Sequence, residues 1–121
     1  MNEVELESRP EWEDWMETPE KTDMAATIYF QVWQNAVAES ASIPKDDLLS
    51  SVSDYLNAKV RACTAYMLFS ETLMKLGFTR YSCPDSIYHW AGDFHLVRRP
   101  GVPDFIATDG ENHIKFFKEE E

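Results

Sequence analysis

Apolar residues recur at helical spacing through the first two thirds of the chain and in short, strand-like runs through the last third. In a helix, apolar positions repeat every three to four residues, whereas in a strand they alternate with polar ones. A chain that begins with helices and ends with strands is typical of the α+β class. We therefore predict two or three N-terminal helices, one of them long, packed on a small C-terminal antiparallel sheet of three to four strands.

The first predicted helix is short and acidic. Ser8 and Glu11 have the spacing of a capping box, in which each side chain accepts a hydrogen bond from a free backbone N–H of the first turn. Trp12, Trp15 and Met16 follow at i, i+3 and i+4, so they share one face of the helix. Carboxylates occupy the opposite face. We expect a helix that its two tryptophans hold in place.

The second predicted helix begins with Thr18 as its N-cap and Pro19 in the first helical position. Small polar residues end the pattern before Pro44. The stripe of apolar residues between these limits predicts one buried helix face. Its members are Ala25, Ile28, Tyr29, Val32, Trp33, Ala36 and Val37.

The third predicted helix begins at Pro44, and Gly77 has the position of a C-terminal stop. An unbroken helix over residues 44–76 is roughly 50 Å long, whereas a compact domain of this size is roughly 26–30 Å across. Either the helix breaks near Asn57 or Thr64, or it extends beyond the body and packs against a second copy. Its apolar stripe consists of Leu49, Val52, Leu56, Val60, Cys63, Met67 and Met74, and it is widened by Leu48, Tyr55, Tyr66 and Leu73.

Beyond Gly77 the pattern predicts short strands separated by turns. The dipeptide Asp109-Gly110 lies between two apolar runs and is a strong signal for a β-hairpin. The expected strands cover residues 78–81, 86–90, 94–97, 105–107 and 114–117.

Size and composition predict one domain over residues 1–121, with an acidic segment (1–20), a helical part (21–77) and a β part (78–121). Apolar residues make up 44% of the chain, which argues against global disorder. There is no long apolar run and no basic N-terminal segment, so we predict a cytoplasmic location.

The formal net charge of −11 is concentrated at the two ends of the chain. Residues 1–20 carry −7, residues 21–100 are neutral, and residues 101–121 carry −4. Phosphate groups are bound mainly by Lys and Arg, so nucleic acid and anionic membranes are disfavoured as direct ligands. An acidic surface instead predicts a basic protein partner.

One segment carries the chemistry of a nuclease. Pro103-Asp104 precedes an apolar strand, and the Asp109-Gly110 turn follows it. This segment resembles part of the PD-(D/E)xK nuclease superfamily, in which such an Asp and a Glu-x-Lys on the next strand hold Mg²⁺ for phosphodiester cleavage. Here the next strand ends in Phe-Phe-Lys118 and lacks that order. The resemblance implies Asp104 as the key acid, with Glu71 as a second one.

Histidines and cysteines give weaker signals. His89, Asp93 and His95 surround one predicted turn near Cys83, but their spacing is not that of a zinc site. Cys63 lies on the apolar stripe of the third helix, where we expect a buried and inert thiol. We expect both cysteines to be reduced and predict no metal and no cofactor.

The leading hypothesis is therefore a non-enzymatic binding protein that docks on a basic surface of a nucleic-acid-handling protein and inhibits or modulates it. In composition it resembles phage-encoded inhibitors of host nucleic-acid enzymes, some of which act as nucleic-acid mimics. A small or degenerate nuclease is the first alternative. The second is a homo-oligomeric assembly module that pairs through Leu49, Leu56, Cys63 and Met67. The predicted partner-binding residues are Glu11, Trp12, Glu13, Asp14, Trp15, Glu17, Glu119, Glu120 and Glu121.

Overall fold

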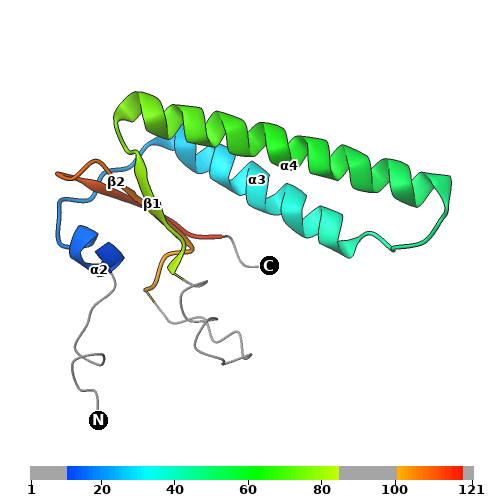
Figure 1. Cartoon of the computed structure of the whole chain (residues 1–121), viewed down its shortest axis with the longest axis horizontal. Helices are drawn as coiled ribbons and strands as arrows, with labels where there is room; N and C mark the ends of the chain where they lie inside the picture. The colour runs from blue at the N-terminus through cyan, green and yellow to red at the C-terminus, as the bar shows by residue number, and fades with distance from the viewer. Residues whose placement is uncertain (1–10, 85–100, 119–121) are drawn as a thin grey trace, which may run out of the picture. The chain divides into compact units, whose positions relative to one another are not determined.

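The computed structural model describes residues 11–84 and 101–118. It confirms the α+β class, with helices followed along the chain by a three-stranded antiparallel sheet (Figure 1). The described residues form two compact units. The sheet unit contains residues 11–22, 77–84 and 101–117, and the helical hairpin contains residues 23–76. The prediction of a single domain stays a prediction.

The sheet unit is built from β1 (Arg80–Ser82), β2 (Phe105–Thr108) and β3 (His113–Phe116) in the order β1-β2-β3. Residues 19–21 run parallel to β3 and add two backbone hydrogen bonds at its outer edge. The acidic N-terminal segment is therefore joined to the C-terminal strand. The strands predicted over residues 86–90 and 94–97 lie outside the described residues.

The predicted hairpin between β2 and β3 is confirmed. Thr108 pairs with His113, and Gly110 in the connecting turn has a φ of +97°, which favours glycine. The Asp109 carboxylate accepts hydrogen bonds from the backbone N–H groups of Glu111 (2.8 Å) and Asn112 (2.7 Å). These two bonds stabilise the charged form and lower the pKa of Asp109.

Side chains alternate between the two faces of β2 and β3. Ile106 and Lys115 are paired on one face, while Phe105 and Phe116 are paired on the other. The short helix α2 (Glu11–Trp15) is the first helix predicted from the sequence, and its tryptophans pack against Ile106. Ser8 of the predicted capping box lies outside the described residues.

The helical hairpin begins with α3 (Met24–Ser42). The Asp23 carboxylate caps this helix by accepting a hydrogen bond from the Ala26 N–H at 2.8 Å. The predicted start at Thr18 and Pro19 is therefore wrong, because the Pro19 carbonyl instead accepts a hydrogen bond from the His113 N–H at 3.0 Å. The predicted end before Pro44 is confirmed.

The second helix of the hairpin, α4 (Leu49–Leu76), is one unbroken element of 28 residues. At 1.5 Å per residue it is about 42 Å long, with no break at Asn57 or Thr64. It starts five residues later than predicted, after a turn in which the Asp46 carboxylate accepts a hydrogen bond from the Leu48 N–H at 3.0 Å. Gly77 ends it with a φ of +88°, as predicted. Among the described helices, none has the length and hydropathy that crossing a lipid bilayer requires.

Small side chains fill most of the space between α3 and α4. The helical residues that are buried are mainly alanines, with an aromatic group at one level of the hairpin. In that group, Phe30 packs on Phe69 and Trp33 packs on Tyr66, with ring centroids 5.6 and 4.8 Å apart. The buried small residues are Ala26, Ala36, Ser40, Ala58, Ala62 and Ala65. Small residues allow two helices to approach closely.

Candidate functional site

The acidic helix α2 is fixed on the sheet by its tryptophans. Trp12 and Trp15 are 5% and 8% exposed, which places their indoles in the core of the sheet unit. The Glu11 carboxylate forms an ion pair with Arg80 at 2.7 Å, and the Arg80 guanidinium lies 5.4 Å from the centroid of the Trp15 ring. The Arg80 side chain on β1 therefore contacts the first and the last residue of α2.

The residues predicted to bind a partner differ in the solvent exposure of their side chains. The structure exposes Glu11, Asp14 and Glu17, leaves Glu13 half-buried and buries both tryptophans. The surface that α2 presents thus consists of carboxylates rather than indoles. Glu119, Glu120 and Glu121 lie outside the described residues.

A polar cluster that the sequence did not reveal lies where residues 18–20 meet β3. The Thr18 hydroxyl donates to the Trp15 carbonyl at 2.6 Å, so its oxygen accepts the hydrogen of His113 Nδ1 at 3.0 Å. Lys115 forms an ion pair with Glu20 at 3.0 Å. Burial lowers the pKa of His113 from its ordinary value of 6.5, and the nearby Glu20 carboxylate partly opposes that shift. This cluster joins the two ends of the sheet unit.

The candidate nuclease residues lie in different units. Asp104 precedes β2, is half-buried, and donates its backbone N–H to the Phe116 carbonyl at 3.0 Å. Glu71 is exposed on α4, and Lys118 follows the end of β3. Over residues 11–84 and 101–118, no three His, Cys, Asp or Glu side chains are grouped so as to hold a metal ion. His89, Asp93 and His95 lie outside these residues.

Cys63 and Cys83 are both in the thiol form rather than in a disulfide, as expected. The expectation that Cys63 is buried is wrong, because the face of α4 that carries it points away from α3. Cys83 is exposed directly after β1.

The outward face of α4 holds the seven central residues of the apolar stripe predicted from the sequence, whereas Leu73, which was predicted to widen that stripe, is buried. We call this set the outer stripe: Leu49, Val52, Leu56, Val60, Cys63, Met67 and Met74. At 3.6 residues per turn, it is centred about 140° around the helix from the buried positions Ala58, Ala62, Ala65, Phe69 and Leu73. The periodicity was read correctly, but the stripe is not the face that packs in the hairpin.

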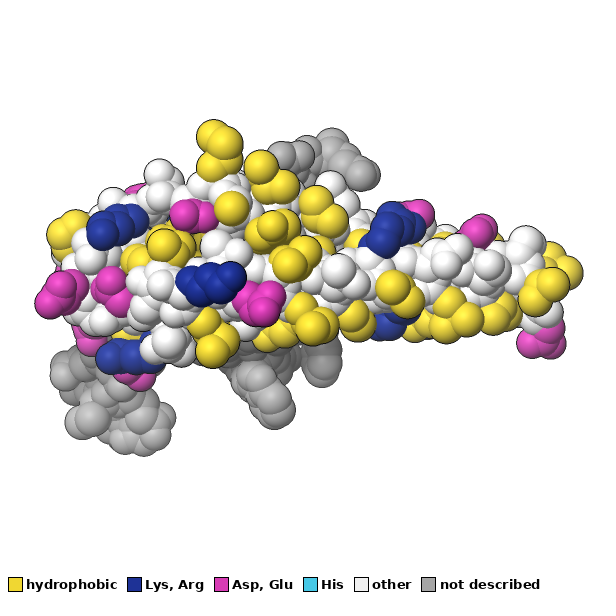
Figure 2. All heavy atoms as spheres, turned by 90° about the horizontal axis from the view of Figure 1, so that it is seen from above, with side chains coloured by type: hydrophobic (Ala, Val, Ile, Leu, Met, Phe, Trp, Pro, Cys, Tyr) yellow, Lys and Arg dark blue, Asp and Glu magenta, His cyan; other side chains and the backbone are white. Residues whose placement is uncertain are grey.

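Exposure confirms this orientation. Leu49 is 83% exposed, Val60 64% and Met67 63%. Figure 2 looks down on α4 and shows apolar side chains that recur along the helix among few charged ones. The stripe of α3 is also displaced from its predicted place, since Ile28 and Val32 are exposed while Phe30 is buried.

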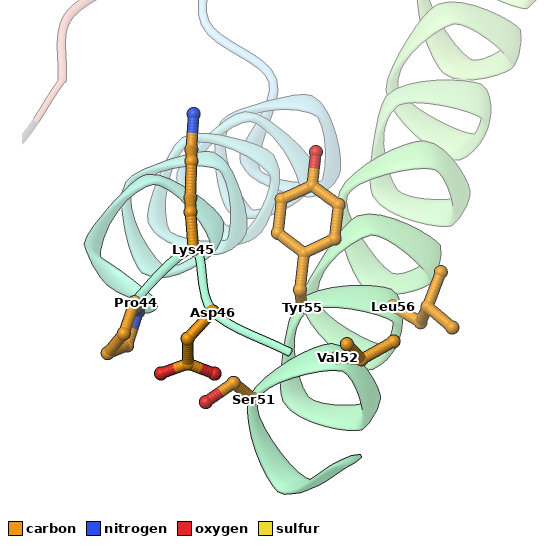
Figure 3. A pocket seen from close by; sticks show the side chains of 7 residues that line it. All are labelled: Pro44, Lys45, Asp46, Ser51, Val52, Tyr55 and Leu56. Carbon is orange, nitrogen blue, oxygen red and sulfur yellow. The ribbon is translucent and has the colours of Figure 1, made fainter. Parts of the chain in front are cut away.

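A hollow lies at the end of the hairpin where α3 connects to α4 (Figure 3). Its volume is about 340 Å³, and it contains the outer-stripe residues Val52 and Leu56 together with Tyr55. Lys45 and Asp46 on the connecting segment supply polar groups at its edge. The outer stripe therefore ends in a pocket that is large enough for one side chain.

The signal that sequence reasoning missed is the second apolar face of α4. Ala58, Ala62 and Ala65 follow helical spacing, and small residues at such spacing indicate close contact with another helix. Once these alanines are assigned to the α3 contact, the outer stripe has no partner within the described hairpin.

Comparison with known proteins gives no relative from which to infer a function. No family model, no curated protein and no solved structure matches the chain.

Proposed function

We propose that this protein is a non-enzymatic interaction protein that binds another protein chain through the outer stripe of α4. One observation carries the proposal: α4 buries three alanines together with Phe69 and Leu73, and leaves the seven apolar residues of the outer stripe exposed. A cytoplasmic location, as expected from the sequence, is part of the same proposal.

Large aliphatic side chains gain more free energy from burial than alanines do. Removing a large aliphatic side chain from water is worth about 1.5–3 kcal/mol, and an alanine contributes much less. A helix that only had to pack in a hairpin would bury its large residues and expose its small ones. Contiguous exposed apolar surface on a folded protein is typical of an interaction site.

The hollow beside Tyr55 supports the same assignment. Binding energy in protein interfaces is concentrated in side chains that fill pockets. Val52 and Leu56 line the hollow and also belong to the outer stripe, so one ligand surface could cover both. We therefore expect the strongest contact near this end of α4.

The test compares two glutamates introduced on the same helix. Val60→Glu places a charge in the outer stripe, whereas Asn57→Glu places it at an exposed position outside the stripe. Both should keep the helical circular dichroism of the wild type. Only Val60→Glu should weaken binding to other chains. Sedimentation velocity measures self-association, and capture from a native lysate measures binding to other proteins. Equal behaviour of the two variants in both measurements would overturn the proposal.

A second candidate function is docking of the acidic helix α2 on a basic protein, in the manner of an inhibitor or nucleic-acid mimic. The observation in its favour is that the buried tryptophans hold α2 in one orientation, so that the Asp14 and Glu17 side chains are exposed on a fixed support. Such charges mainly accelerate association and select a partner of opposite charge.

This candidate has its own test. Asp14→Lys combined with Glu17→Lys should abolish capture of basic proteins from a native lysate at low salt, while Glu111→Lys, an exposed charge reversal elsewhere in the sheet unit, should not. Capture by the wild type should also weaken between 50 and 300 mM salt, roughly the range in which the Debye length falls below about 10 Å. If neither the double reversal nor added salt reduced capture, docking through α2 would be contradicted.

A further inference from the structure

Within the proposed function, we infer that the outer stripe is covered by a second copy of this chain, with the two α4 helices antiparallel across a two-fold axis near Cys63. The inference rests on the proposed interaction surface and names its occupant. It combines the charge, length and centre of the stripe.

Charge makes a second copy an acceptable partner despite the net charge of −11. The outer stripe is bordered by one base, Lys59, and one acid, Glu71, and α4 as a whole carries three bases and two acids. Most of the negative charge lies outside the helical hairpin. A basic partner would find no carboxylate on this stripe to recognise, whereas an identical uncharged stripe is complementary to it.

The length of the stripe sets how much area a dimer can bury. A helix of about 42 Å and about 10 Å in diameter offers a flat footprint on the order of 400 Å². This flat footprint is about half of the roughly 800 Å² per partner of a standard interface, and interdigitated side chains bury more accessible surface than a flat footprint. A shorter stripe would support only a transient encounter.

The symmetry follows from the position of Cys63. In a closed dimer the same patch of each copy faces the other across a two-fold axis. An antiparallel pair of equal helices in full overlap puts the axis at their midpoint, and Cys63 is next to the midpoint of Leu49–Leu76. With the axis on Cys63, half a residue from this midpoint, Lys59 is level with Met67 of the second copy, and Glu71 is level with Tyr55. No like charges are brought together along the edges.

The experiment uses the full chain with single cysteines. In a Cys83→Ser background, a short bismaleimide should join two copies through Cys63 and give a product of twice the chain mass of 14.0 kDa. In a Cys63→Ser background, exposed Cys83 serves as the matched control and should give little product. Sedimentation equilibrium should show a dimer whose dissociation constant rises at least about tenfold with Val60→Glu, because that change buries an unpaired charge, and stays unchanged with Asn57→Glu.

Direction is tested in a background that lacks both native cysteines. Leu49→Cys mixed with Met74→Cys should cross-link, while Leu49→Cys alone should not. Cross-linking of Leu49→Cys with itself would show a parallel pair and overturn the inference, as would equal cross-linking through Cys63 and Cys83. A monomer at all concentrations would also overturn it; if Val60→Glu still lost captured lysate proteins, the interaction face would stand and only its occupant would be wrong.

Discussion

The sheet unit and the helical hairpin differ in how much of their large apolar residue content is buried. In the sheet unit, Trp12, Trp15 and Ile106 form the core, and the outer surface of α2 is acidic. In the hairpin, Ala58 and Ala62 are inside while Leu49 and Val60 are outside. Because both units are in the same solvent, we attribute the difference in buried side chains to what each unit packs against. The sheet unit buries its tryptophans, whereas the hairpin buries Phe30, Phe69 and Leu73 beside its alanines and leaves the outer stripe exposed.

The contribution of large side chains to the core of the sheet unit can be tested by removing one of them. Trp15→Ala should destabilise the fold by about 3–5 kcal/mol, because it leaves a cavity beside Ile106. Trp15→Phe should cost much less, since the indole nitrogen of Trp15 is buried without a hydrogen-bond partner in the described structure and no bond is lost. Urea unfolding followed by circular dichroism measures both. Equal losses for the two variants would contradict the packing of Trp15 in the core.

In the hairpin, the damaging change is to enlarge a buried side chain rather than to remove one. Ala58 is fully buried between α3 and α4, so Ala58→Leu should push the helices apart and cost about 1–3 kcal/mol. Val60→Leu adds volume on the exposed stripe and should change stability by less than about 0.5 kcal/mol. Thermal unfolding monitored by the helical signal gives both values. If Val60→Leu were the more harmful of the two, the assignment of inner and outer faces would be wrong.

Much of the fold could be predicted because it depends on short-range signals. Gly77 ends α4, and the Asp109-Gly110 turn joins β2 to β3, where the chemistry of one or two residues determines the backbone. The tryptophans of α2 were also placed correctly on one helix face. Periodicity likewise identified the outer stripe as a continuous set of positions.

The sequence could not decide between two residues or two helix faces that fit the local pattern equally well. Thr18 and Asp23 are both good N-caps, and the pairing of residues 19–21 with β3, more than 90 positions away, settled the choice in favour of Asp23. Similarly, α4 is apolar on two sides, and periodicity alone does not say which side meets α3. For that reason the stripe stayed open between two predictions, a buried face that carries Cys63 and a contact with a second copy.

The join between the N-terminal segment and β3 should be sensitive to pH. Because the folded-state pKa of His113 is lowered, the unfolded chain binds a proton more readily, and stability should fall as the pH drops below about 6.5. Glu20, which opposes this shift, and Lys115 are the charged groups beside it. His113→Asn keeps a donor for Thr18 and removes the titration.

Urea unfolding of both proteins between pH 7.5 and 5 tests this prediction. The difference in unfolding free energy between wild type and His113→Asn should shrink as the pH falls, while His89 and His95, present in both proteins, cancel. The lowered pKa of Asp109 affects stability only at more acidic pH, below its ordinary value of 3.8. A difference that grows with acidification would mean that the charged form of His113 stabilises the fold.

The smallest expected effect concerns the ion pair at the edge of the sheet unit. Glu11 and Arg80 form a contact of 2.7 Å, but their side chains are 71% and 54% exposed, so water and salt weaken it. A double-mutant cycle with Glu11→Gln and Arg80→Gln should give a coupling energy of about 0.2–1 kcal/mol at low salt, and less at 0.5 M salt. Arg80→Gln also removes the contact with Trp15, which a matched cycle between Arg80→Gln and Trp15→Phe measures separately. Coupling above about 2 kcal/mol in the first cycle would mean that charge, rather than the tryptophan core, holds α2 on the sheet.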